Sequence, residues 1–200
     1  SIIINNCYFH NNGNDAIYVS GAAASKGIII TNSTFANSSA SHSIIEVRNG
    51  SSDPTEDIEL TVDHCTFYNN TYGDGDYTNI RAAKLAKSYI TNCIFAHPDA
   101  YAKYTAYSYG GTISNCLTYN LTSGYRNWSP CAVFSNNITA DPLFNDIANN
   151  KYTFAGNWVT MELSPARGAA TDGSDLGDPR WYISRSEERR VGNESRSRWA

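Results

Sequence analysis

The sequence predicts an all-β protein built as a parallel β-helix, a solenoid in which short strands stack coil upon coil. Three observations indicate this fold. A block with period 2 recurs along the chain, its copies follow one another at intervals typical of one solenoid coil, and the composition suits strands and turns. Charged residues make up only 17% of the 200 residues, whereas Asn, Ser, Thr, Gly and Tyr are abundant. Such a composition is typical of all-β proteins.

The recurring block combines an apolar alternation, a central Asn or His, and a following Cys or Ser. Its copies are IINNCYF (3–9), IITNSTF (29–35), TVDHCTF (61–67), YITNCIF (89–95) and TISNCLT (112–118). The anchors before the Cys or its equivalent are unevenly spaced, at Asn6, Asn32, His64, Asn92, Asn115 and Asn136. Irregular periods of this size, with period 2 inside each block, predict a solenoid of about six coils rather than helical repeats.

Each block reads as two short strands joined by a tight corner. In GIIITNSTFAN, Ile28 and Ile30 share one face of a strand, and Asn32 follows at a bend. Ser33 and Phe35 then resume the inward facing, one step out of parity. Asn suits such a corner because it tolerates left-handed backbone geometry and can bond its own turn. His64 takes the place of Asn in one copy.

A third strand per coil is expected after each block. The segments are AIYVSG (16–21), IIEVRNG (44–50) and YTNIRAA (77–83). Alternation places one set of side chains inside, namely Val19, Val47 and Ile80. It places their neighbours on an outward, solvent-facing sheet: Tyr18, Ser20, Glu46, Arg48, Asn79 and Arg81.

The chain divides into three parts. Residues 1–140 carry the coils, and residues 141–183, rich in Pro and Gly, are expected to close the last coil, since a solenoid end exposes its core. Residues 184–200 change composition abruptly and resemble translated cloning-vector or adaptor sequence; a disordered native tail is the alternative. Because the chain opens directly on an apolar strand, we expect residue 1 to be an internal cut in a longer protein.

The charge distribution excludes some partners. Residues 185–200 hold 5 Arg and 3 Glu, which leaves 15 − 5 = 10 basic and 19 − 3 = 16 acidic residues in the body, a net charge of −6. This mildly acidic body gives no basic footprint for nucleic acid. No run approaches the ~18 apolar residues of a membrane-spanning helix. We expect a monomer.

The repeated cysteines could be metal ligands, disulfide halves, nucleophiles or buried wall material. No CxxC pair of the kind found in zinc sites exists. One Cys per coil, beside Ile and Phe on the inward face, favours a packed ladder of free thiols. Stacked coils would bring the thiols close enough for disulfides, but their parallel side chains fit that bond poorly. Cys131 lies outside the ladder, in a loop or the wall.

The coils, together with DPLF (141–144) and SPARGAATDGSDLGDPRW (164–181), resemble bacterial pectate-lyase-like right-handed β-helix proteins of polysaccharide-utilisation systems. The resemblance covers roughly residues 1–183. It implies a right-handed coil, a polysaccharide partner and export to the periplasm or cell surface. It does not imply one particular activity.

Arg48 and Arg81 are the candidate catalytic residues. The interval between them nearly equals the interval from Asn32 to His64, so we expect them to stack on adjacent coils of the outward sheet. Like charges at strand spacing disfavour each other, which indicates an anionic partner between them, such as an acidic polysaccharide. Arg suits a carboxylate clamp, but its high pKa opposes a role as a base.

The segment HSIIEVRNGSS (42–52) resembles the catalytic strand of the chondroitinase B and alginate lyase family. In that family carboxylates before the strand hold calcium and a Lys follows the apolar pair. Here Arg48 stands at the Lys position, Ser43 stands where a calcium-ligating Glu is expected, and Glu46 lies nearby. The resemblance thus implies lyase chemistry and Ca²⁺ as the cation if a metal binds, with both departures placing the analogy in doubt.

The remaining candidates are substrate-binding residues around the same face. They are Glu46, Asn79, Tyr77, Lys84, Lys103 and Tyr104. Tyr offers sugars an apolar face with a polar tip. His42 precedes the outward strand and could border a groove, whereas the acidic turn YGDGDY (72–77) lacks the distal Glu of an EF-hand and reads as a solvated turn. Glu46 paired with an Arg on a solvated face is the alternative that involves no ligand.

Three functions remain open. The first is a polysaccharide lyase, ranked above a glycoside hydrolase because no facing pair of carboxylates is evident. The second is a non-catalytic carbohydrate-binding or cell-surface adhesion β-helix. The third is a structural fragment of a larger enzyme.

Overall fold

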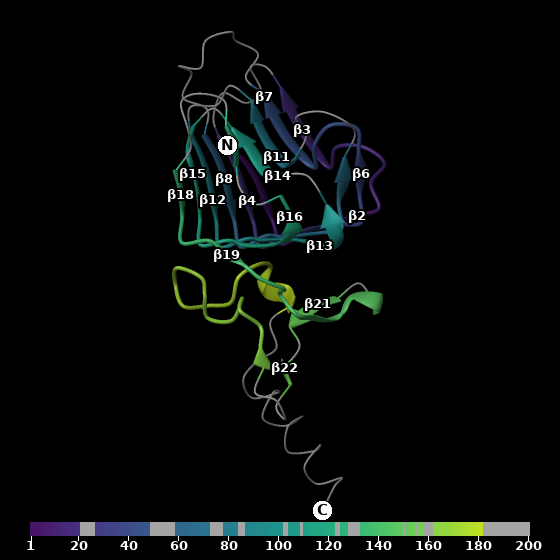
Figure 1. Cartoon of the computed structure of the whole chain (residues 1–200). Coiled ribbons are helices and arrows are strands. Elements are labelled where there is room, and N and C mark those ends of the chain that lie inside the picture. The colour runs from purple at the N-terminus through teal and green to yellow at the C-terminus, as the bar shows by residue number, and fades with distance from the viewer. Residues whose placement is uncertain are drawn as a thin grey trace, which may run out of the picture.

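The prediction of an all-β parallel solenoid is confirmed by the computed structural model (Figure 1). The structure describes residues 1–20, 27–48, 59–72, 78–83, 87–101, 104–108, 110–122, 125–127, 133–149, 151–154, 156–157 and 162–181. None of the helices in these ranges is long and apolar enough to cross a membrane.

Three parallel sheets form the walls of the solenoid, with six strands in each of the first two sheets and five in the third, added in chain order. The first sheet contains β1 (Ile2–Asn5), β4 (Ile28–Thr31), β8 (Glu59–Asp63), β12 (Lys87–Thr91), β15 (Thr112–Ser114) and β18 (Val133–Ser135). The second contains β2 (Tyr8–His10), β5 (Thr34–Ala36), β9 (Thr66–Tyr68), β13 (Ile94–Tyr101), β16 (Leu117–Leu121) and β19 (Ile138–Thr139). The third contains β3 (Ile17–Ser20), β7 (Ile45–Arg48), β11 (Thr78–Ala83), β14 (Tyr104–Ser108) and β17 (Tyr125–Asn127). β6 (Ser39–Ala40) and β10 (Thr71–Tyr72) form a short extra pair.

The corner between the first and second sheets is the predicted Asn position. All six anchors adopt left-handed backbone geometry, with φ between 48° and 59°. This conformation costs most residues about 1–2 kcal/mol, and Asn least among those with a side chain. A second series at the end of the second-sheet strands, not predicted, has the same geometry: Asn11, Asn37, Asn69 and Asn120. Asn69 Nδ2 donates to Asn37 Oδ1 at 2.8 Å, so side-chain amides at this corner bond between neighbouring coils.

The cysteines form the buried ladder that their spacing predicts. Cys65, Cys93 and Cys116 are fully buried free thiols. The Cys65 N–H donates to Cys93 Sγ, and the Cys93 N–H to Cys116 Sγ, both at 3.4 Å. Each thiol in turn donates to the carbonyl two residues earlier, as Cys93 does to Thr91 at 3.0 Å. Burial raises the pKa of Cys93 well above its usual value, which leaves it protonated and unreactive.

A stack of Phe rings runs through the interior, one ring on each of four successive coils. The rings of Phe9, Phe35, Phe67 and Phe95 stack with centroids 4.9, 5.0 and 4.8 Å apart. Offset aromatic pairs contribute about 0.5–1.5 kcal/mol each beyond their buried area. These rings lie on one row of the second sheet because β2, β5, β9 and β13 pair in a single register.

The closing segment packs across the side of the second sheet instead of over the last coil. It contains β20 (Phe144–Asp146), β21 (Lys151–Phe154), β22 (Gly156–Asn157), β23 (Glu162–Leu163) and the 3-10 turns η2 (Ile147–Asn149) and η3 (Pro179–Trp181). Figure 1 shows it in green and yellow beside that sheet. Among its described residues, Tyr152, Ala166, Ala170 and Leu176 belong to a buried hydrophobic cluster with residues of the coils such as Tyr68, Ile94 and Leu117.

Two contacts fix how closely this segment approaches. Gly177 has φ +85°, and a Cβ there would lie 2.6 Å from Thr66 Oγ1, so only glycine fits. Thr34 Oγ1 donates to Asp178 Oδ2 at 2.6 Å and accepts from Trp181 Nε1 at 2.8 Å. On the last coil, Phe134 pairs with the buried Ile113 but is 44% exposed, which fits a segment that covers the side rather than the end.

Candidate functional site

The predicted site lies on the outer face of the third sheet, but its register differs from the expectation. Glu46 pairs with Arg81, and Arg48 pairs with Ala83, so the expected stacking of Arg48 on Arg81 is wrong. The offset between β7 and β11 is 80 − 45 = 35, whereas on the first sheet the offset between β4 and β8 is 62 − 30 = 32. The additional residues fall between Tyr72 and Thr78, because Tyr72 still pairs with Ala40, an offset of 72 − 40 = 32.

Both guanidinium groups instead converge on one carboxylate. Oε1 of Glu46 accepts from Arg48 Nε and from Arg81 Nη1, the latter at 3.2 Å. The Glu46 side chain is fully buried, whereas the side chains of Arg48 and Arg81 are 38% and 20% exposed. Charge-assisted bonds of this kind are strong, and they offset part of the cost of burying the carboxylate. Within the described residues, Oε2 of Glu46 has no hydrogen-bond partner.

Aromatic residues extend this cluster along the solenoid axis. The register aligns Tyr18, Glu46, Arg81 and Tyr107 on successive coils. The Arg81 guanidinium carbon lies 5.7 Å from the centroid of the Tyr107 ring, a cation–π distance. Tyr18 is 54% exposed, whereas Tyr107 and Glu46 are buried. The row is therefore exposed at Tyr18 and covered at Glu46 and Tyr107, and Arg48 lies in the neighbouring row with Ser20.

Two further side chains approach Glu46 from the turns before β3 and β7. One possible ligand atom each of Asp15, His42 and Glu46 lies within 4.8 Å of the other two. Asp15 Oδ1 accepts from the Ser43 N–H at 3.4 Å, and His42 Nδ1 lies 3.2 Å from Ser41 Oγ. Among the described residues, these are the His and acidic side chains that could jointly hold a metal ion.

The other predicted substrate-binding residues fall in different places. Asn79 is 2% exposed and accepts a bond from Asn70 Nδ2 at 3.3 Å, so its predicted outward orientation is wrong. The cause is a local break in alternation, since both Ile44 and Ile45 are in the core. Tyr104 is half-buried and pairs with Thr78, on the same strand as Tyr107. Tyr77, Lys84 and Lys103 lie outside the described residues.

Sequence reasoning missed Asp15 entirely and did not single out Tyr107. The register of the third-sheet strands would have revealed both, because Ile17 pairs with Ile45 and Arg81 pairs with Tyr107. The first of these pairings places Asp15 level with Ser43, next to His42. The spacing of the anchor residues along the first sheet does not predict this register of the third sheet.

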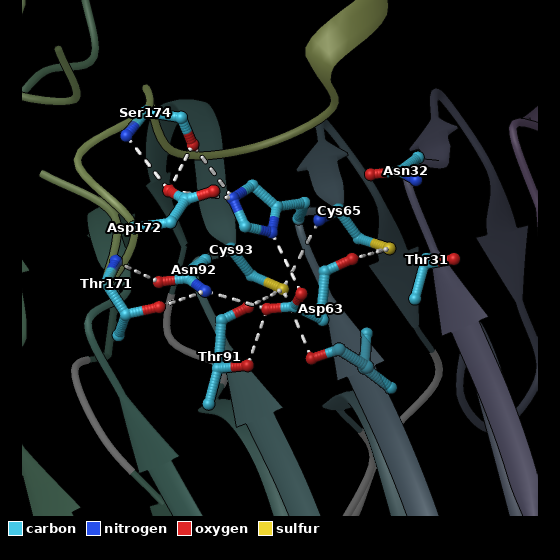
Figure 2. A network of polar contacts seen from close by, with 12 residues as sticks. Thr31, Asn32, Asp63, Cys65, Thr91, Asn92, Cys93, Thr171, Asp172 and Ser174 are labelled. Carbon is cyan, nitrogen blue, oxygen red and sulfur yellow. Dashed lines mark hydrogen bonds and ion pairs between the residues drawn. The ribbon is translucent and has the colours of Figure 1, made fainter. Parts of the chain in front are cut away.

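A second polar cluster joins the coils to the closing segment (Figure 2). His64 Nδ1 lies 2.9 Å from Asp63 Oδ2, and His64 Nε2 lies 3.1 Å from Ser174 Oγ. This connectivity matches a Ser–His–Asp triad. However, the Ser174 hydroxyl donates to Asp172 Oδ1 at 2.6 Å, so its hydrogen is directed at Asp172 and not at His64. The cluster therefore lacks the serine-to-histidine hydrogen bond of a triad, and His64 docks the closing segment to the coils.

The electrostatics of this cluster agree. The bond to Asp63 raises the pKa of His64, against the opposing effect of burial. Burial raises the pKa of Asp63, but bonds from His64, Thr91 and Asn92 together outweigh it and hold the pKa below its usual value. Asn92 also donates to Thr171 Oγ1 at 3.0 Å and accepts from its N–H at 2.9 Å. These coil corners thus bind the segment 171–174.

One cleft, of about 300 Å³, lies away from the arginines, between the second sheet and the closing segment. Its walls are mainly aromatic and apolar, with the polar groups of His97 and Asp141. His97 Nδ1 lies 2.9 Å from the Asp99 carbonyl, and Nε2 has no partner among the described residues. The cleft carries no paired cations among its described lining residues, so the charge cluster at Glu46 remains the better site for an acidic ligand.

Comparison with known proteins supports the fold at family level. A family model described as a right-handed β-helix region matches residues 1–161, that is, all coils and part of the closing segment. A search of curated proteins found no match.

Proposed function

This chain belongs to the right-handed β-helix family, and from that premise we propose that it is a carbohydrate-active protein that binds an acidic polysaccharide. The proposed surface is the outer face of the third sheet, around Arg48 and Tyr18. One observation carries the proposal: two guanidinium groups converge on Glu46, and the side chain of one of them, Arg48, is 38% exposed.

The chemistry of the face suits a uronate chain. Arg48 offers donors to a sugar carboxylate, with planar geometry that favours paired contacts. Tyr18 offers an exposed ring on which a sugar can stack, one coil away in the row that contains Glu46. Rows on neighbouring coils are about 4.8 Å apart. An extended chain along the solenoid axis would therefore meet both residues.

Binding to acidic polysaccharides can be tested by affinity electrophoresis. The protein would migrate through gels that contain polygalacturonate, alginate, chondroitin sulfate or a neutral glucan. We expect retardation in at least one acidic gel and none in the neutral gel. Arg48→Gln and Tyr18→Ala should reduce it, while Lys87→Gln, at an exposed position on the first sheet, should not. Equal retardation of the wild-type protein and all three variants would contradict the proposed surface.

Cleavage by β-elimination is the second candidate, because such a reaction must neutralise the uronate carboxylate while a base removes the neighbouring proton. The paired guanidinium groups fit the first task. Arginine is a poor base because its high intrinsic pKa opposes loss of a proton, so these groups fit the second task poorly. Cleavage can be measured as absorbance of the unsaturated product, in assays with and without calcium. We expect such absorbance only if a group other than these arginines is the base. Binding without turnover would indicate a carbohydrate-binding or adhesion role.

The remaining expectations are proposals of the same kind. We propose a monomer that acts outside the cytoplasm, in the periplasm or at the cell surface, as the resemblance to pectate-lyase-like proteins implies. Fractionation of cells that express the full reading frame would test this location.

A further inference from the structure

We propose that Asp15, His42 and Glu46 form a Zn²⁺ site at the edge of the polysaccharide face. The role of this metal ion in polysaccharide binding rests on the proposed function, whereas metal binding itself can be tested without it. The three side chains come from two neighbouring coils, and a ligand atom of each lies within 4.8 Å of the others. Ligand atoms bound tetrahedrally to one Zn²⁺ at about 2.0–2.2 Å lie roughly 3.4 Å from one another, so side-chain rotations that bring these atoms closer by up to about 1.4 Å would complete the site.

An unsatisfied buried oxygen provides the second, independent observation. Glu46 is fully buried, its Oε1 is occupied by the two arginines, and its Oε2 has no partner within the described part of the chain. A buried carboxylate oxygen without a donor or a cation is costly. One oxygen of the Glu46 carboxylate lies within 4.8 Å of a ligand atom of Asp15 and of His42, so a metal ion held there would give this buried carboxylate a further cation beside the arginines.

The ligand set favours Zn²⁺ over Ca²⁺. One imidazole with two carboxylates suits zinc, which takes His nitrogen and carboxylate oxygen in a four-coordinate shell. Calcium prefers six to eight oxygen ligands, which this cluster does not offer. Three protein ligands leave the fourth position for water or a substrate oxygen.

A divalent ion held by Asp15, His42 and Glu46 would add positive charge beside Arg48 and Arg81. It would therefore strengthen the binding of an acidic chain at this face.

The test is a calorimetric titration of the EDTA-stripped full chain with ZnCl₂ and, separately, CaCl₂. Cys7→Ser and Cys131→Ser would be present throughout, so that these thiols do not bind zinc. We expect one Zn²⁺ per chain and weaker Ca²⁺ binding. Asp15→Asn, which keeps an acceptor for Ser43, and His42→Ala should each weaken Zn²⁺ binding at least ~10-fold. The matched controls Glu59→Gln and His10→Ala, both exposed and on other sheets, should not.

Three results would each overturn the inference. They are the absence of saturable Zn²⁺ binding, Zn²⁺ binding by Asp15→Asn and His42→Ala that is as tight as that of the parent protein, and tighter binding of Ca²⁺ than of Zn²⁺. Gel retardation in EDTA separates it from the proposed function. Retardation without any zinc binding would overturn the metal site and keep the polysaccharide face. Zinc binding that depends on Asp15 and His42, without retardation in any gel, would uphold the site and remove the proposed function.

Discussion

At the residue scale, the Cys position of the repeat serves hydrogen bonding between coils as well as packing. The side chain there donates to a carbonyl two residues back and accepts an N–H from the preceding coil, as Cys93 does. Ser33 fills the same role, since its Oγ accepts from Cys7 N–H at 3.1 Å and donates to Thr31 O at 2.7 Å. This position therefore requires a small side chain that can both donate and accept a hydrogen bond, which Cys and Ser provide.

This role predicts unequal effects of two substitutions at Cys93. Cys93→Ser retains a donor and an acceptor, and we expect it to lower the free energy of unfolding by no more than about 1 kcal/mol. Cys93→Val keeps the bulk but leaves the buried Cys65 N–H unpaired, at a cost of about 1–3 kcal/mol. Urea denaturation would measure both; equal losses would show that packing alone matters.

His64 predicts a pH dependence that Asn at the same corner would lack. Its pKa is raised above the usual 6.5 by the bond to Asp63, so its stabilising effect is complete below pH 6.5 and is lost as pH rises through the folded-state pKa. We expect amides of the 171–176 segment to exchange faster with rising pH than intrinsic rates explain. His64→Asn should remove that excess, and an identical pH response in both proteins would contradict the docking role.

At the element scale, the ion pair between Glu46 on β7 and Arg81 on β11 links two neighbouring coils. The buried Glu46 carboxylate also binds Arg48, and the two arginines differ in exposure. Arg81 is less exposed than Arg48 and also packs near Tyr107. Arg81→Met should therefore destabilise the protein more, by about 3 kcal/mol, because it removes the less exposed of the two guanidinium groups that bind the buried Glu46. Arg48→Met should cost about 1 kcal/mol or less.

Thermal unfolding of both variants, each alone and combined with Glu46→Gln, tests this view. Neutralising Glu46 should recover much of the loss in Arg81→Met. No recovery would mean that Arg81 stabilises through its contact with Tyr107 instead.

The same elements show what sequence could and could not predict. Period 2 and the Asn corners predict the strands of the first two sheets, because those features are local. The register of the third sheet is not predictable from the anchors, because the additional residues between Tyr72 and Thr78 shift β11 alone. The sequence therefore predicts that Arg48 and Arg81 are close and that Glu46 can pair with an Arg, but it does not predict that both arginines bind Glu46.

At the scale of the whole molecule, the closing segment acts as a strap along the coils. Its aromatic rings contact residues distant in sequence. The ring centroid of Trp181 lies 6.0 Å from that of Tyr8 and 5.5 Å from that of Tyr152. Sequence predicts a closing role from the Pro and Gly pattern, but not which face is covered. That choice depends on long-range bonds such as Thr34 to Asp178, which no local pattern encodes.

Trp181→Ala tests the strap. The side chain is half-buried. We therefore expect a loss of about 2–3 kcal/mol, below the roughly 3–5 kcal/mol of a fully buried Trp. Proteolysis should then cut within residues 171–181 first. Tyr18→Ala, an exposed aromatic on the third sheet, is the control and should leave both stability and the cleavage pattern unchanged.

The most direct test of the polysaccharide face is hydrogen–deuterium exchange of the full chain, with and without the acidic polysaccharide that retards it. We expect new protection in peptides that cover β3, β7 and β11, around Tyr18, Glu46 and Arg81. Protection confined to β13, β16 and residues 141–147, which line the cleft at His97, would contradict the proposed surface and would place the sugar at the second sheet instead.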